Sequence, residues 1–229
     1  MLTADLLRRR VLHLDDAVLI LDKPGGLAVH KGTGTQHDLE QFLPLLFDGP
    51  PPRLAHRLDM DTSGCLVLGR TADAAARLGR LFSQRRVEKR YWALVRGRPE
   101  TEAGVIDQPL RKLPGPEGDR MRPDASAPPA VTRWRLLGTA AEVSWLELQP
   151  ETGRTHQLRA HCALMGWPIL GDRLYGRDQI PPLLLHARSI SFQLERARAP
   201  ITATAPVPAA WEPWRSRFHF GDGTDPSTL

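Results

Sequence analysis

A stretch of the chain, residues 56–64, sets an acid beside a base and ends in turn-forming residues. Its sequence is HRLDMDTSG, in which Arg57 precedes the carboxylate Asp59 and an apolar run, 65–68, follows directly. Because Gly64 accepts a positive φ and the hydroxyls before it can bond nearby backbone, we expect Asp59 on a stiff loop at the mouth of a buried strand. Such a loop suits a reactive group, whose geometry must be held. The alternative is a structural ion pair at a strand end.

The elements that must hold this loop are short. Asp38 is expected to cap a helix that runs to Leu46, and either Thr71 or Asp73 to cap the next one. The segment 113–130, which is rich in proline and glycine, is interpreted as an extended loop. Apolar runs predict strands at 17–21, 27–30, 65–68, 91–95, 130–137, 142–148, 183–192 and 201–205. Amphipathic patterns predict helices that end near residue 82, over 155–165 and over 211–218. Many short strands with few helices predict an α+β fold.

Composition narrows the class of protein. The chain has 229 residues, of which 41% are hydrophobic and 25% charged, as in a globular protein. No apolar run approaches the roughly 20 residues that cross a bilayer, and no signal peptide precedes the first strand, so we expect a cytoplasmic protein without a membrane partner. Cys65 and Cys162 lie in apolar surroundings and are expected as buried free thiols. The sequence contains no Cys-x-x-Cys pair, so it predicts no zinc site of the usual spacing.

The charge balance favours a polyanionic partner. The net charge is +5 and the pI about 9.7, and neutralising phosphates releases counterions. Arginine, alanine and proline are abundant while lysine is scarce, so the same balance can reflect a GC-rich genome.

Four stretches together resemble the motifs of a known family. They are HRLD followed by TSG at 56–64, DKPGGLAVH at 22–30, KRYWALVRG at 89–97, and TGRTHQLRAH at 152–161 with PILGD at 168–172. In their order along the chain, these four stretches resemble the motifs of the RNA pseudouridine synthases that modify ribosomal and transfer RNA. The resemblance spans about residues 15 to 205.

The resemblance implies a fold and an organisation. We expect a mixed, mainly antiparallel twisted sheet in two halves with flanking helices and a central catalytic cleft. The domain prediction is an N-terminal arm over 1–13, one catalytic domain over 14–220 and a disordered tail over 221–229. A monomer without an obligate protein partner is expected, with recognition of an rRNA or tRNA stem-loop by the catalytic domain itself.

The resemblance also implies a chemistry. Pseudouridine formation detaches uracil at N1 and reattaches it through C5, with no net redox change, hydrolysis or phosphoryl transfer, so no cofactor and no metal is expected. Asp59 is the expected catalytic carboxylate, kept ionised by Arg159. Tyr91 is expected to stack on the extruded uracil and to relay the C5 proton, while Tyr175 is interpreted as structural. Whether Asp59 attacks C1′ or C6, or assists proton removal to a glycal, stays open.

Further residues are expected to meet RNA. Arg57 is predicted to fill the gap left by the flipped uridine, and Leu185 to wall the uracil pocket or to be a core leucine. Lys23, Arg154 and His156 are expected as RNA contacts or as scaffold, and a core role is preferred for His56.

Two other functions are alternatives to this one. A metal-dependent phosphodiesterase would use His56, Asp59, Asp61 and His186 as ligands, although their spacing matches no ligand pattern. A non-catalytic RNA-binding protein would not need all three matched catalytic positions to be occupied.

Overall fold

The computed structural model describes residues 3–31, 37–115, 119–176 and 182–218. They form two compact units, unit 1 from Met1–Lys89 with Ala187–Pro206, and unit 2 from Arg90–His186 with Val207–Leu229. The division falls within two strands, β5 (Val87–Arg96) and β11 (Leu185–Phe192), which begin in one unit and end in the other. The predicted tail over 221–229 lies outside the described residues.

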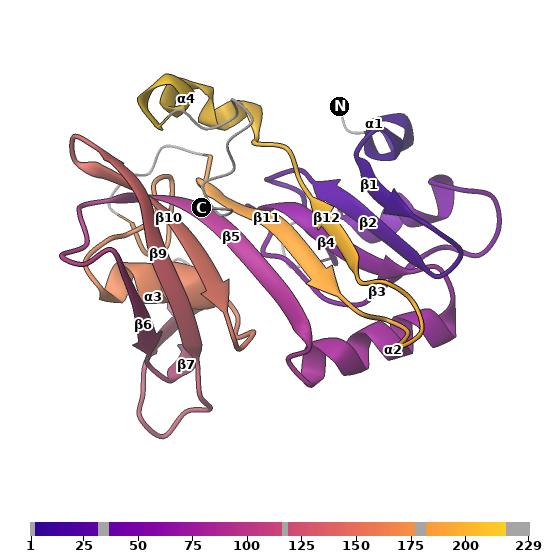
Figure 1. Cartoon of the computed structure of the whole chain (residues 1–229), viewed down its shortest axis with the longest axis horizontal. Coiled ribbons are helices and arrows are strands. Elements are labelled where there is room, and N and C mark those ends of the chain that lie inside the picture. The colour runs from indigo at the N-terminus through magenta and orange to yellow at the C-terminus, as the bar shows by residue number, and fades with distance from the viewer. Residues whose placement is uncertain (1–2, 32–36, 116–118, 177–181, 219–229) are drawn as a thin grey trace. The chain divides into compact units, whose positions relative to one another are not determined.

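Unit 1 contains a sheet built around two buried strands (Figure 1). Every residue of β2 (Val18–Lys23) and β4 (Ser63–Gly69) is buried, as their continuous apolar runs predict. The two strands are antiparallel, and their register sets Lys23 opposite Gly64. The loop before β4 therefore lies beside the turn after β2. Neighbouring strands in this sheet are β1 (Val11–Leu14) on β2, β11 and β3 (Arg53–Leu54) on β4, and β12 (Ile201–Thr204) on β11.

The predicted N-terminal arm folds onto unit 1. Residues Ala4–Arg8 form helix α1, whose N-cap Thr3 accepts a hydrogen bond from the Leu6 amide. Leu7 is fully buried, and β1 pairs antiparallel with β2. Most of the arm is thus part of the unit 1 structure.

The helices of unit 1 begin directly after the residues that cap them. Helix α2 (Ala72–Ser83) begins after Thr71, whose hydroxyl accepts from the Ala74 amide, so Thr71 and not Asp73 is the cap. Its buried side packs against β2 and β4 through a cluster that includes Leu78 and Leu81. Asp38 also caps as predicted, but the helix expected from it to Leu46 is two short 3₁₀ turns, η1 (Leu39–Gln41) and η2 (Leu43–Leu45). Pro44 lies in η2, where proline cannot continue an α-helical hydrogen-bond ladder.

Unit 2 contains a sheet in the order β5-β10-β9-β6. The bounds are β6 (Ala103–Asp107), β9 (Val131–Ala140) and β10 (Val143–Pro150), and all three pairings are antiparallel. Side chains alternate along β5: Trp92 and Leu94 join one core cluster, while Ala93, Val95 and the partly buried Tyr91 join another.

Helices cover both faces of the unit 2 sheet. Leu158 and Cys162 of α3 (Gln157–Leu164) belong to the cluster that includes Tyr91. Trp211, at the end of η3 (Ala209–Trp211), and Phe218 of α4 (Glu212–Phe218) belong to the cluster of Trp92 on the other face. We call these the α3 face and the α4 face.

Two local predictions are wrong. The expected loop over 113–130 contains strand β8 (Arg120–Pro123), which pairs with β7 (Leu110–Leu113) as a two-stranded hairpin. Its strands carry mostly exposed polar residues, so the apolar signal of a strand is absent. The segment 27–30 makes only an isolated bridge, Ala28 to Asp38. The α+β class with a mainly antiparallel sheet is confirmed; the catalytic cleft stays a prediction.

Candidate active site

The loop that carries Asp59 is tied down by backbone hydrogen bonds within unit 1. Asp59 is half-buried, and its carbonyl accepts from the Thr62 amide at 3.1 Å, which closes a turn. The next carbonyl, that of Met60, accepts from the Gly26 amide at 3.0 Å. Gly26 has φ +81°, a value that favours glycine. The loop is therefore fixed to the turn after β2, as expected for a rigid carboxylate.

The side chain of Lys23 also holds this loop in place. Its side chain is 1% exposed, and Nζ donates to the carbonyls of Pro24, Leu27 and Met60, each at 2.8 Å. Burial lowers the pKa of Lys23 to about 7, although the carboxylates of Asp61 and Asp59 act in the opposite direction. An ammonium enclosed by three carbonyls supports the scaffold role, one of the two expected for Lys23. A contact of Lys23 with RNA stays a prediction.

His56 is a structural residue of unit 1. Its Nε2 accepts the Val67 amide hydrogen at 2.9 Å, and its ring stacks on Phe82 at a centroid distance of 4.3 Å. Burial, together with the charge of Lys89, lowers the pKa of His56 to about 3, so the ring is neutral. Because Nε2 is used as an acceptor from the backbone, that nitrogen does not suit a metal ligand. Arg57 next to it is exposed, and its predicted role in base flipping stays a prediction.

Arg159 of α3 is held by a carboxylate that sequence reasoning left without a role. Its Nε and Nη2 donate to the two oxygens of Asp172, both at 2.8 Å, and both side chains are buried. Burial raises the pKa of Asp172, but the hydrogen bonds and charge of Arg159 and the Tyr175 and Leu174 amides outweigh it and hold the pKa below its ordinary value. The pair fixes the guanidinium on unit 2. Its sequence signal was the Gly-Asp ending of the stretch PILGD, at 168–172.

The residues before Arg159 build the start of α3. Gln157 accepts from the Thr152 hydroxyl at 2.7 Å and from the Arg154 amide at 3.0 Å, and donates to the Val131 carbonyl. His156 lies in the left-handed region, with φ 49°. This network explains the motif's polar residues as the support of a turn that starts the helix.

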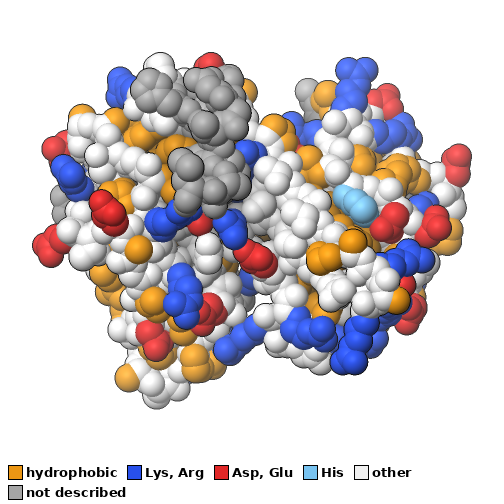
Figure 2. All heavy atoms as spheres, in the orientation of Figure 1, with side chains coloured by type: hydrophobic (Ala, Val, Ile, Leu, Met, Phe, Trp, Pro, Cys, Tyr) orange, Lys and Arg blue, Asp and Glu red, His pale blue; other side chains and the backbone are white. Residues whose placement is uncertain are grey.

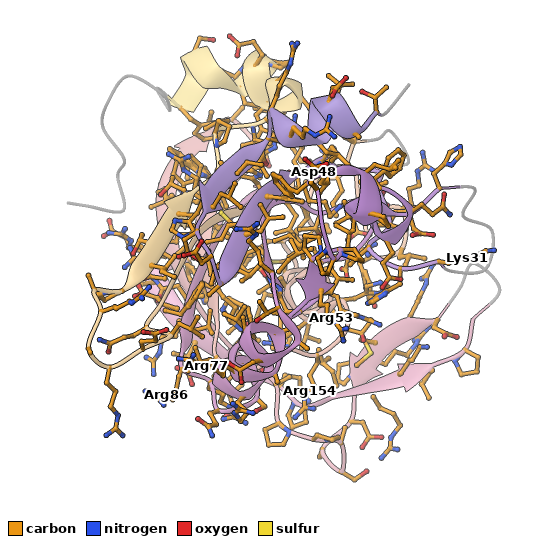
Figure 3. All side chains as sticks on the ribbon, turned by 90° about the vertical axis from the view of Figure 1, so that its right-hand side faces the viewer. Lys31, Asp48, Arg53, Arg77, Arg86 and Arg154 are labelled. Atoms are coloured by element: carbon orange, nitrogen blue, oxygen red, sulfur yellow. The ribbon has the colours of Figure 1, made fainter. Side chains whose placement is uncertain are left out.

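Two of the predicted RNA contacts belong to this turn. The Arg154 side chain, labelled in Figure 3, donates from Nε to the Pro129 carbonyl at 3.1 Å. His156 Nδ1 lies 3.3 Å from the Tyr175 hydroxyl. Both contacts support a scaffold contribution. A contact of Arg154 or His156 with RNA stays a prediction.

Tyr91 and Leu185 lie on the α3 face. Both pack against the core cluster that includes Leu158, with Leu185 buried and Tyr91 half-buried. Tyr175 is structural as predicted: its hydroxyl accepts from the Met121 amide at 2.7 Å. Its ring lies under the Arg159 guanidinium, 5.4 Å from ring centroid to Cζ.

The predicted site residues thus form two groups. Unit 1 holds Lys23 and Asp59 on contacting segments, and unit 2 holds Tyr91, Arg159 and Leu185 on α3 and the face that it covers. That the two groups meet around one uridine stays a prediction. Cys65 and Cys162 are buried free thiols, as expected.

The described residues offer neither a metal-binding cluster nor a membrane-spanning helix. Within the described ranges, no group of three or more His, Cys, Asp or Glu is arranged to hold a metal ion. None of the helices described is both long and apolar enough to span a membrane.

Comparison with known proteins gives consistent matches. A family model described as RNA pseudouridylate synthase matches residues 17–164. An uncharacterized RNA pseudouridine synthase of Zymomonas mobilis is 44% identical over 214 residues, covering 90% of this chain and 97% of that protein. The ribosomal large subunit pseudouridine synthase D of Nitrosomonas europaea is 39% identical over 184 residues, covering 78% of this chain and 53% of its relative.

A solved structure extends the similarity to the fold. The human RNA pseudouridylate synthase domain containing 4 matches with a TM-score of 0.80 at 29% identity, over 94% of this chain and 95% of that one. The similarity therefore extends beyond the matched family region, 17–164.

Proposed function

The chain belongs to the RNA pseudouridylate synthase family, enzymes that isomerise uridine in RNA to pseudouridine, and we propose that Asp59 is its essential carboxylate. The observation that supports this assignment is the fixed geometry of the Asp59 loop. Backbone hydrogen bonds and the buried Lys23 ammonium hold the loop, while Asp59 itself is only half-buried. Preorganisation of this kind is what a catalytic group requires.

Arg159 is the proposed partner of Asp59. A guanidinium near a carboxylate in a partly dry site favours the ionised acid. Asp172 already orients this guanidinium through two hydrogen bonds of 2.8 Å, so little side-chain freedom remains to be lost when substrate binds. The proposal requires Asp59 and Arg159 to act on the same uridine.

Tyr91 and Leu185 are proposed to hold the uracil. The half-buried ring of Tyr91 offers a stacking surface, and its hydroxyl is the proposed relay for the proton that leaves C5. Leu185, packed in the same cluster, is the proposed apolar wall beside it. Arg57, exposed near Asp59 in the chain, is proposed to replace the flipped uridine in the RNA stack.

The proposed substrate is a stem-loop of ribosomal RNA or transfer RNA. The relative named for the ribosomal large subunit supports ribosomal RNA. Positive side chains are spread among acidic ones over the surface seen in Figure 2, and the net charge of +5 suits a polyanion. We further propose that the protein acts as a monomer in the cytoplasm, which light scattering and cell fractionation would test.

The deciding experiment measures tritium release from RNA labelled at uracil C5. Asp59→Asn is expected to abolish release while RNA binding persists. The matched control is Asp61→Asn, which removes a second carboxylate from the same loop and is expected to keep most of the activity. Undiminished release by Asp59→Asn would remove Asp59 from the mechanism. Activity that survives EDTA would separate this function from a metal-dependent phosphodiesterase.

A further inference from the structure

A basic pocket lies in the unit 2 sheet, separate from the proposed uracil site. It has a volume of about 240 Å³ and is lined by Arg90, Arg133, Trp134, Arg135, Glu147 and Gln149. Three arginines face one glutamate, so the lining carries an excess of two positive charges. None of these residues belongs to the motifs discussed for catalysis except Arg90, which precedes Tyr91.

Strand alternation assigns the charged side chains to the α4 face. Arg90 precedes Tyr91 on β5, and Glu147 follows Leu146 on β10, so each points away from a neighbour that packs on the α3 face. Across β9 and β10, Glu147 opposes Arg135 and Gln149 opposes Arg133. The pocket therefore opens on the side of the sheet opposite to Tyr91.

The buried carboxylate of Glu147 lies close to two of the arginines that line the pocket. Its side chain is 2% exposed, and it lies 3.9 Å from the Arg90 guanidinium and 3.7 Å from that of Arg135. These distances give attraction but exceed those of hydrogen bonds. By contrast, the paired Arg159 and Asp172 are 2.8 Å apart.

We propose that this pocket binds a phosphate group, most directly a phosphodiester of the RNA substrate outside the target uridine. Planar guanidinium forks match phosphate oxygens in pairs, which lysines do not. Arg135 is 37% exposed and Arg133 is 61% exposed, so both remain accessible to a ligand. Arg133 is paired with Glu151 at the rim, at 2.5 Å, and would exchange that exposed pair for phosphate. The same chemistry would accept inorganic phosphate, and the test separates these two sources.

The test uses two double variants that remove the same charge. Arg133→Gln with Arg135→Gln removes the accessible forks and leaves Arg90, beside Tyr91, untouched. Arg196→Gln with Arg198→Gln is the control, because these arginines are exposed and Arg198 is paired with a glutamate in the same manner as Arg133. Arg133→Lys with Arg135→Lys keeps the charge but not the fork. RNA affinity is measured over a range of salt concentrations, together with tritium release at saturating RNA.

The variant Arg133→Gln with Arg135→Gln is expected to bind RNA about fivefold to tenfold more weakly. The slope of log K against log salt concentration should fall by about one. The RNA affinity of the double lysine variant should lie between those of the double glutamine variant and the wild type. Tritium release at saturating RNA should be unchanged for all variants. Stabilisation of the wild type, but not of the glutamine pair, by inorganic phosphate in thermal unfolding would identify a free-phosphate site. An affinity and slope equal to those of the control pair, without phosphate stabilisation, would overturn the proposal. These binding readouts do not depend on Asp59, so failure here leaves the catalytic proposal intact.

Discussion

Arg159 and Asp172 form a buried, two-pronged ion pair, with both nitrogen–oxygen distances 2.8 Å. The two residues are 13 positions apart, one on α3 and the other just after the isolated bridge at Ile169. The pair links Asp172, at the end of the motif over 152–172, to Arg159 near its centre. Arg159 is thus a proposed catalytic residue with its own dedicated positioning residue.

The first prediction concerns Asp172→Asn. Removing the charge leaves the Arg159 guanidinium buried without its counterion, which costs about 3–5 kcal/mol in comparable pairs. Urea unfolding should show a loss of that order. The exposed pair of Lys112 and Asp119 provides the control, since Asp119→Asn should cost at most about 1 kcal/mol. Equal losses in the two variants would contradict a special role for the buried pair.

The second prediction is a pH dependence that comes from Lys23. Burial lowers its pKa in the folded protein to about 7, whereas an unfolded lysine has a pKa of about 10.4. Between these values the unfolded chain binds more protons, so the free energy of unfolding contributed by Lys23 rises with pH. Lys23→Met removes this titration.

The measurement is the unfolding free energy of the wild type and of Lys23→Met from pH 6 to about 10. The difference, wild type minus variant, should increase with pH over this window, by on the order of several kcal/mol. Lys112→Met, at an exposed lysine, is the control. A flat difference for Lys23→Met would mean that the buried ammonium titrates normally.

The third prediction concerns Gly64, the second residue of β4, which follows the Asp59 loop. Its φ is +105°, and a Cβ there would lie 2.3 Å from the Ala187 carbonyl oxygen. Gly64→Ala should therefore cost more than about 3 kcal/mol in unfolding free energy, through backbone strain and a main-chain clash. Gly79→Ala in α2 is the control, because nothing lies near its Cβ position. That variant should gain about 0.5–1 kcal/mol.

The fourth prediction separates the two tyrosines. Tyr91→Phe keeps the ring but removes the proposed proton relay, so tritium release should fall about 10²–10⁴-fold with little change in RNA affinity. Tyr175→Phe removes the acceptor of the Met121 amide and should instead lower the unfolding free energy by about 1–3 kcal/mol. Comparable rate losses in both variants would place the essential hydroxyl elsewhere.

Sequence patterns predicted the elements whose burial follows a simple period. The apolar runs of β2 and β4 are buried at every position, and Thr71 caps α2. The hairpin of β7 and β8 escaped prediction, because its strands are short and largely exposed. A strand without a buried face has no alternation to reveal it.

The sequence by itself determined the family, through four ordered motifs, and with it the residues proposed for catalysis. Only the tertiary structure decided which charged residues are free to meet a ligand. Lys23 lies in a motif beside a glycine-rich turn, yet its ammonium is enclosed by carbonyls up to 37 residues away. In the sequence, nothing distinguishes Asp172 from the other acidic residues. In the folded chain, it accepts hydrogen bonds from Arg159. The environment of a charged group depends on donors and acceptors that come from distant segments of the chain. The hydrophobic periodicity of a local segment does not predict which partners these are.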